Sequence, residues 1–134
     1  MPAALLDTNA ISDIMMGNAS VQDKADNHPD SILTSAIAVG EIQYGLDRLP
    51  LGKKRTDLER RAQQVFQCLV IEAATEQTAA GYGRLKAPLE RVGLNLGDND
   101  LWIAATALTL GCILVSRDKL FQRIPNLLVE DWSV

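Results

Sequence analysis

The sequence predicts an α/β fold, with a central parallel sheet flanked by helices on both faces. Short apolar runs, such as residues 3–6 and 112–115, have the length and composition of buried strands. They alternate with longer segments of helical periodicity, and residues 98–110 are apolar almost all round, as in a central buried helix. This alternation indicates a parallel sheet, whose ligands bind beyond the carboxyl ends of its strands.

Local signals place each element along the chain. The expected strands are residues 3–6, 32–35, 70–71, 112–115 and 127–129. The expected helices are residues 8–14, 36–48, 53–69, 76–89 and 98–110, with weaker helical character at 18–27. We expect Thr8 or Asn9 to cap the first helix and Thr75 to cap the helix at 76–89. Pro88 should kink or end the helix at 76–89. The helices at 36–48 and 53–69 should form a projecting hairpin.

The size and charge of the chain limit the classes of function. Its 134 residues are expected to form one domain, residues 1–134, with a core large enough to need no disulfide. The net charge of −4, from 13 basic and 17 acidic residues, argues against a nonspecific nucleic-acid coat protein. Setting aside the four acidic residues discussed next leaves 13 of each sign. The acidity is therefore expected to be local to one pocket.

Four acidic residues lie where apolar segments meet a turn or a small-residue helix: Asp7, Glu41, Asp100 and Asp118. No lysine or arginine lies within four positions of the first three, so their convergence would concentrate negative charge. Carboxylate oxygens are ligands for Mg²⁺ or Mn²⁺, and a divalent ion relieves their mutual repulsion. The pattern predicts a metal-dependent enzyme of phosphate chemistry, with the acidic pocket at the carboxyl ends of the strands.

Each acidic residue also has a simpler structural interpretation. Asp7 could cap a helix or form an Asx turn, and Asp98 is well placed as a helix N-cap. Asp118 has Arg117 and Lys119 beside it, which would suit a surface ion pair. Glu41 is harder to explain this way, because it shares an apolar, small-residue face with no cation at helical spacing.

The sequence lacks the residues that other catalytic mechanisms require. The lone histidine, His28, stands beside a proline in a turn, which argues against a histidine-pair ribonuclease. No phosphate-binding glycine loop, nucleophile elbow or zinc site is present. Trp102 and Trp132 are expected to be packing residues, and Cys68 and Cys112 to be buried, reduced thiols. The basic residues could grip a phosphate backbone, contact a partner protein or simply be solvated; they are Lys53, Lys54, Arg55, Arg60, Arg61, Arg84, Lys86 and Arg91.

No segment predicts a membrane span or a signal peptide. The longest stretch without charge, residues 101–116, is too short and too polar to cross a bilayer. The amino-terminal apolar run has no basic leader and is interrupted by Asp7. We expect a cytoplasmic location.

The ordered set of motifs resembles the PIN-domain nucleases, and within them the VapC-type toxins of bacterial and archaeal toxin-antitoxin pairs. The segments that carry the resemblance are LLDTN at 5–9, TSAIAVGEIQYGL at 34–46, GDNDLWIAATALTLG at 97–111, LVSRD at 114–118 and VEDW at 129–132. The resemblance makes Asp7, Glu41, Asp100 and Asp118 the acidic metal site. It adds Asp98 at a variable position, either as a ligand or as a helix cap, and makes Thr8, Asn9 and Ser116 supporting groups.

The resemblance also implies an activity and partners. It implies a Mg²⁺- or Mn²⁺-dependent endoribonuclease in which a metal-activated water attacks an RNA phosphodiester, leaving a 5′-phosphate and a 3′-hydroxyl, with transfer RNA as a reasonable substrate class. It further implies a homodimer and a VapB-type antitoxin, for which the hairpin at 36–69 is the candidate contact.

Other functions remain to be weighed against the nuclease. The main alternative is a catalytically inactive PIN-like module that binds RNA or a partner peptide. A phosphoryl-accepting receiver domain would need an aspartate and a lysine after strands where this chain has neither. An Asp-x-Asp phosphatase would need an aspartate where Asn9 stands.

Overall fold

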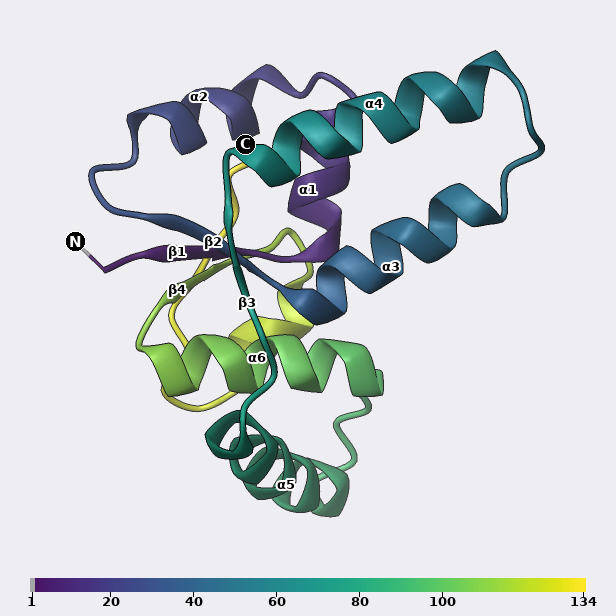
Figure 1. Ribbon diagram of the computed structural model, residues 1–134. Coiled ribbons are helices and arrows are strands. Elements are labelled where there is room, and N and C mark those ends of the chain that lie inside the picture. Colours follow the sequence, from purple (N-terminus) through teal and green to yellow (C-terminus); the bar gives the residue numbers. More distant parts are fainter. Residues whose placement is uncertain (1) are drawn as a thin grey trace.

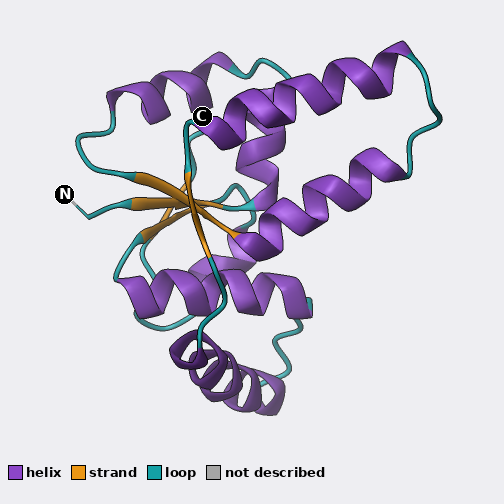
Figure 2. Ribbon diagram, viewed as in Figure 1, coloured by secondary structure: helices purple, strands orange, loops and turns teal. Residues whose placement is uncertain are grey.

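The fold is a five-stranded, all-parallel sheet with helices on both faces, as expected. The computed structural model describes residues 2–134. The strand order is β3-β2-β1-β4-β5, so the first strand lies at the centre. Figure 2 shows the strands, in orange, between the helices. The strands are β1 Ala4–Leu6, β2 Ile32–Ser35, β3 Val70–Glu72, β4 Ile113–Val115 and β5 Val129–Glu130. Every residue of β1 and β4 is buried, which matches the apolar runs that predicted them.

Six α-helices and one 3₁₀ helix connect the strands of the described chain. They are α1 Thr8–Met15, α2 Ala19–Asn27, α3 Ala36–Asp47, α4 Lys53–Gln67, α5 Glu76–Arg91, α6 Asp98–Leu110 and η1 Lys119–Arg123. Figure 1 shows α1, α2 and α4 on one side of the sheet and α6 on the other, with α5 packed outside α6. The α3–α4 hairpin projects away from the sheet, as predicted (Figure 1).

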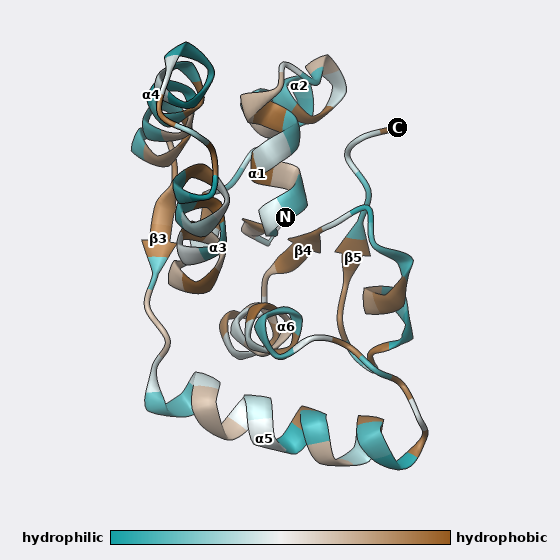
Figure 3. Cartoon of the chain, turned by 90° about the vertical axis from the view of Figure 1, so that its right-hand side faces the viewer, coloured by the Kyte–Doolittle hydropathy of each residue, from teal (hydrophilic) through white to brown (hydrophobic). Residues whose placement is uncertain are grey.

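The core follows the hydrophobic pattern of the sequence. In α6 six residues are buried, and the helix ends at Gly111, whose left-handed φ of 66° suits a glycine. The predicted central helix is confirmed. Figure 3 shows mostly hydrophobic colour on β3 and β4, whereas the outer turns of α4 are hydrophilic. No helix within residues 2–134 combines the length and apolar composition needed to cross a membrane.

The pairing of the strands determines which residues lie at the edge of the sheet where the site is expected. Leu6 of β1 pairs with Val115 of β4 and with Thr34 of β2. All three strands run in the same direction, so the residues that follow them emerge at one edge of the sheet. Asp7 and Ser116 are the next residues after their strands, and the amide of Asp7 donates to the carbonyl of Val115 at 3.1 Å.

Several local predictions were wrong, each because a tertiary or capping interaction decided the outcome. The N-cap of α1 is Asp7, not Thr8 or Asn9. Helix α5 does not end at Pro88 but continues to Arg91, so of the two predicted effects of this proline the ending is wrong. Thr75 caps that helix as predicted.

Two further differences concern the last strand and one cysteine. The last strand starts two residues later than predicted, at Val129. Cys68 is exposed rather than buried, because it lies at the end of α4 before an edge strand, whereas Cys112 is buried as expected.

Candidate active site

Asp7 is the most buried of the four acidic residues Asp7, Glu41, Asp100 and Asp118, which we call the acidic rim. Its side chain is 4% exposed, and its Oδ1 accepts a hydrogen bond of 2.8 Å from the amide of Ala10 in the first turn of α1. The capping interpretation is thus correct for Asp7, yet it uses only one carboxylate oxygen. A cap alone does not require such burial, because most helix N-caps lie at the surface.

The environment of Asp7 disfavours its charged form. Burial raises the pKa of this carboxyl from its ordinary value of 3.8 to about 6. Hydrogen bonds from the Ser116 side chain and the Ala10 amide oppose that rise, and the charge of Asp100 adds to it. A buried carboxylate with a raised pKa at a strand end is typical of a functional site.

Glu41 is joined to the strand β1 end through Thr8. The Thr8 hydroxyl donates a hydrogen bond of 2.5 Å to Oε1 of the half-buried Glu41. Thr8 therefore fixes the position of one Glu41 carboxylate oxygen, while its role in the site stays a prediction. The face around Glu41 is less apolar than predicted, because Tyr44 is 65% exposed and Gly45 is also exposed, while Ala38 is buried.

Asp100 links the acidic residues electrostatically. It lies in the first turn of α6 and is half-buried. Burial raises its pKa, and the negative charges of Glu41 and Asp118 raise it further. Since Asp100 also acts on Asp7, its charge interacts with those of all three other acidic residues. The fold therefore brings the four predicted carboxylates into one region.

Asp118 and Ser116 form the loop that follows β4. The amide of Asp118 donates to the Ser116 hydroxyl at 3.0 Å, and Oδ1 of Asp118 accepts from the amide of Leu120 at 3.0 Å. Ser116 is 2% exposed, and its side chain lowers the pKa of Asp7.

Asp98 points toward α5 rather than serving as the helix cap, because the N-cap of α6 is Gly97. Its Oδ1 accepts from the Lys86 ammonium at 2.8 Å and from the Tyr82 hydroxyl at 2.9 Å. The hydrogen bond from Lys86 is the main reason that the pKa of Asp98 is lowered. The Tyr82 ring stacks on Trp102 with ring centroids 4.5 Å apart, so this part of α6 is fastened to α5.

Asn9 is exposed, and none of the hydrogen bonds between side chains of the described residues joins it to a carboxylate. Arg117 does not pair with Asp118. Its Nε instead donates to Oδ2 of Asp13 in α1 at 3.2 Å. Sequence reasoning gave Asp13 no role, because its position shows no motif and its partner lies 104 residues away.

The donor set of the rim suits a hard divalent ion. All four acidic side chains offer oxygen ligands. Within residues 2–134 no ion pair involves Asp7, Glu41 or Asp100, so no protein cation neutralises them directly. Yet no three acidic, histidine or cysteine side chains of the described chain are close enough to hold one metal ion together. Coordination by three of them would require side-chain movement.

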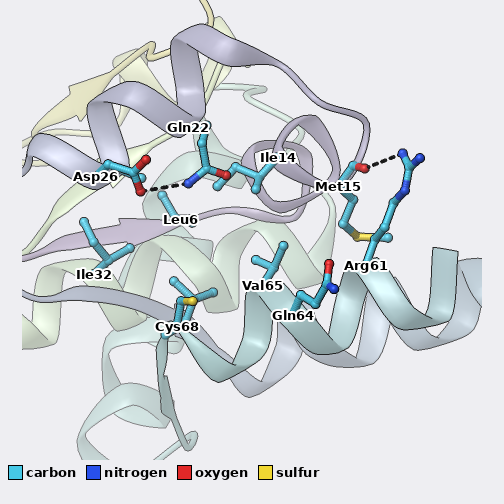
Figure 4. A pocket seen from close by; sticks show the side chains of 12 residues that line it. Leu6, Ile14, Met15, Gln22, Asp26, Ile32, Arg61, Gln64, Val65 and Cys68 are labelled. Atoms are coloured by element: carbon cyan, nitrogen blue, oxygen red, sulfur yellow. Dashed lines mark hydrogen bonds between the residues drawn. The ribbon is translucent and has the colours of Figure 1, made fainter. Parts of the chain in front are cut away.

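A separate cavity lies between α1, α2 and α4, and no member of the acidic rim lines it. Its volume is about 330 Å³. Figure 4 shows Val65 of α4 facing Ile14 of α1, and Cys68, just after α4, near Ile32 of β2. Gln22 and Asp26 of α2 form one polar edge, joined by a hydrogen bond of 2.8 Å. Arg61, which donates to the carbonyl of Met15 at 3.0 Å, forms another.

Comparison with known proteins decides the family. The model of the PIN domain matches residues 4–127. The chain belongs to the PIN domain family. Its sequence is 34% identical over 105 residues to Ribonuclease VapC2 of Rickettsia felis, covering 78% of this chain and 76% of that protein. It is 28% identical over 131 residues to the tRNA(fMet)-specific endonuclease VapC of Shigella flexneri, covering 96% and 97%.

A solved structure has the same PIN fold. The crystal structure of VapBC2 from Rickettsia felis, bound to a DNA fragment from their promoter, matches with a TM-score of 0.86 and 30% identity. The match covers 97% of this chain and 98% of that one. The parallel sheet and its acidic rim therefore lie in a PIN domain, as the motifs indicated.

Proposed function

We propose that this chain is a metal-dependent endoribonuclease toxin, neutralised by a VapB-type antitoxin. The observation that carries the proposal is the buried Asp7, whose pKa is raised to about 6 and whose charge interacts with that of Asp100 at the rim of a PIN domain. Relatives named ribonucleases, which match most of the chain, support RNA as the substrate. The relative named for tRNA(fMet) makes transfer RNA the first substrate to test.

Asp7, Glu41, Asp100 and Asp118 would hold Mg²⁺ or Mn²⁺. When bound, such an ion lowers the pKa of water and offsets the charge of the phosphate. Asp7 supplies the least exposed carboxylate, and the side chain of Ser116 lowers its pKa. Thr8 fixes the orientation of Glu41. We leave Asp98 out of this set, because Lys86 and Tyr82 already occupy its carboxylate.

Four of the eight predicted basic residues, Arg55, Arg60, Arg61 and Lys86, are engaged within the protein. Arg55 pairs with Asp47 and Glu59, and Arg60 pairs with Asp57. Exposed pairs of this kind reduce the charge available to an RNA backbone. The structure therefore favours the interpretation of these residues as solvated helix faces over a basic RNA-binding stripe.

The antitoxin would contact α4 at the cavity of Figure 4. Its apolar floor and polar edges suit a side chain from an amphipathic segment, the common mode of peptide binding in a groove. This places the antitoxin on the predicted hairpin at 36–69, on the face of α4 toward α2. The resemblance to the VapC-type toxins implies a homodimer in addition.

Cleavage of total RNA tests the proposal. Wild-type protein, free of antitoxin, is incubated with Mg²⁺, Mn²⁺ or EDTA, and new 5′ ends are mapped. Asp7→Asn should abolish cleavage while keeping the helix cap, because asparagine caps equally well. Asp23→Asn makes the same chemical change on the exposed face of α2 and should leave cleavage intact.

The binding-module alternative predicts different results. A folded wild-type protein that cuts no RNA with either metal would contradict the enzyme. Growth inhibition retained by an Asp7→Asn, Glu41→Gln double variant would favour a module that acts by binding RNA or a peptide.

A further inference from the structure

Arg117 occupies the same rim as the acidic residues. The pairing of Leu6 with Val115 places the chain beyond β1 beside the chain beyond β4. The amide of Asp7 donates to the carbonyl of Val115 at 3.1 Å, and Arg117 is the second residue after Val115. It therefore follows directly on the segment that Asp7 contacts.

A single ion pair fixes the Arg117 side chain. Its Nε donates to Oδ2 of Asp13 at 3.2 Å, and the two side chains are 49% and 19% exposed, respectively. Asp13 lies in α1, the helix that Asp7 caps. No other hydrogen bond of the Arg117 guanidinium is formed within the described chain. Both Nη groups remain available for a ligand in solvent.

The charge of Arg117 reaches the acidic site. It is the weakest of the influences that lower the pKa of Asp7, and likewise of Asp131. Within residues 2–134 no other basic side chain contributes to the pKa shifts of Asp7 or Asp100. Lys86, by contrast, binds Asp98 on the α5 side of α6.

We propose that Arg117 binds the phosphate under attack as a further catalytic residue, and that Asp13 positions it. A guanidinium presents parallel N–H groups that match two phosphate oxygens, and its Nη groups are the ones left free by Asp13. Positive charge fixed at this point would offset the negative charge that develops during cleavage. The inference rests on the proposed ribonuclease function.

The main test measures kcat and KM for an RNA that the wild type cleaves. Arg117→Ala should lower kcat by about 100-fold or more, in the range seen when one charge-stabilising donor is removed. Arg117→Lys should be intermediate, because an ammonium keeps the charge but loses the fork. Arg91→Ala removes the same charge from the exposed end of α5 and should leave kcat unchanged.

Two readouts separate chemistry from a structural role. Millimolar guanidinium ion should restore part of the activity of Arg117→Ala. If Arg117 served only to connect its loop to α1 through the ion pair with Asp13, free guanidinium would not restore activity. Asp13→Asn should lower kcat in the wild type yet cause little further loss in Arg117→Ala, because the positioning residue acts through Arg117. If Arg117→Ala does not fold, the lysine variant and the Asp13→Asn variant still decide the matter.

The possible failures are distinguishable. Unchanged kcat in Arg117→Ala and Arg117→Lys, with Asp7→Asn inactive, would overturn the role of Arg117 and leave the nuclease standing. A loss in Arg117→Ala that guanidinium does not restore and Arg117→Lys does not relieve would show a structural ion pair. Additive losses from Asp13→Asn and Arg117→Ala would show that Asp13 does not act through Arg117. A wild type that cuts no RNA would overturn both proposals.

Discussion

Replacing Asp7 by asparagine should stabilise the metal-free protein at neutral pH. The native pKa of about 6 lies above the ordinary value of 3.8, so the folded state holds this proton more tightly than the unfolded state. The free energy of unfolding therefore falls as pH rises between these values. The difference between the two pKa values corresponds to a loss of about 3 kcal/mol in the free energy of unfolding. This loss is complete above the native pKa and absent below the ordinary value.

The asparagine variant isolates this cost, because it removes the charge but keeps an oxygen for the amide of Ala10. Urea unfolding in EDTA, followed across pH from about 4 to about 8, gives the free energy of unfolding for both proteins. We expect the variant to exceed the wild type by up to about 3 kcal/mol at the upper end. The two values should approach each other at the lower end.

Metal ions provide the internal control. Mg²⁺ or Mn²⁺ at about 100 times its dissociation constant should stabilise the wild type by about 2.7 kcal/mol. The same ion should have little effect on Asp7→Asn. Parallel pH profiles for the two proteins in EDTA would refute the argument from burial, whatever the metal does.

Three further predictions concern the surroundings of the site. Thr8→Val should lower the cleavage rate by about 10-fold to 100-fold, because Glu41 loses the hydrogen bond that orients it; an unchanged rate would remove Thr8 from the site. Ser116→Ala should move the acidic limb of the pH–rate profile upward, since the pKa of Asp7 rises without that hydrogen bond; a downward shift would contradict this. Gly83→Ala should raise the free energy of unfolding by about 0.5–1 kcal/mol in urea titrations, because an added Cβ meets nothing within 4 Å inside α5. Destabilisation there would indicate a contact that the fold does not show.

The alternation of apolar runs and helical segments was sufficient to predict the sheet. The parallel order follows, because each strand is separated from its neighbour in space by a helical crossover. The same logic placed Asp7 at a strand end and Asp100 at the start of the central helix. Motif order added Glu41, whose support by Thr8 the structure then described.

The remaining features depend on contacts that sequence spacing does not encode. Asp98 is of a residue type and at a position that suit a helix N-cap, but its carboxylate accepts a hydrogen bond from Lys86 of α5 instead. Arg117 has an acidic neighbour in sequence and nevertheless pairs with Asp13 of α1. Both outcomes depend on how helices pack across the sheet. Cys68 is likewise exposed because the neighbouring β3 is an edge strand.

The most direct test of the central claim is the chemistry of the RNA ends formed in ¹⁸O-labelled water. If the acidic residues hold a divalent ion that activates water, the label should enter the new 5′-phosphate and the other end should be a 3′-hydroxyl. Asp7→Asn should give neither product. Formation of a 2′,3′-cyclic phosphate with an unlabelled 5′-hydroxyl would show attack by the RNA itself and would contradict the account.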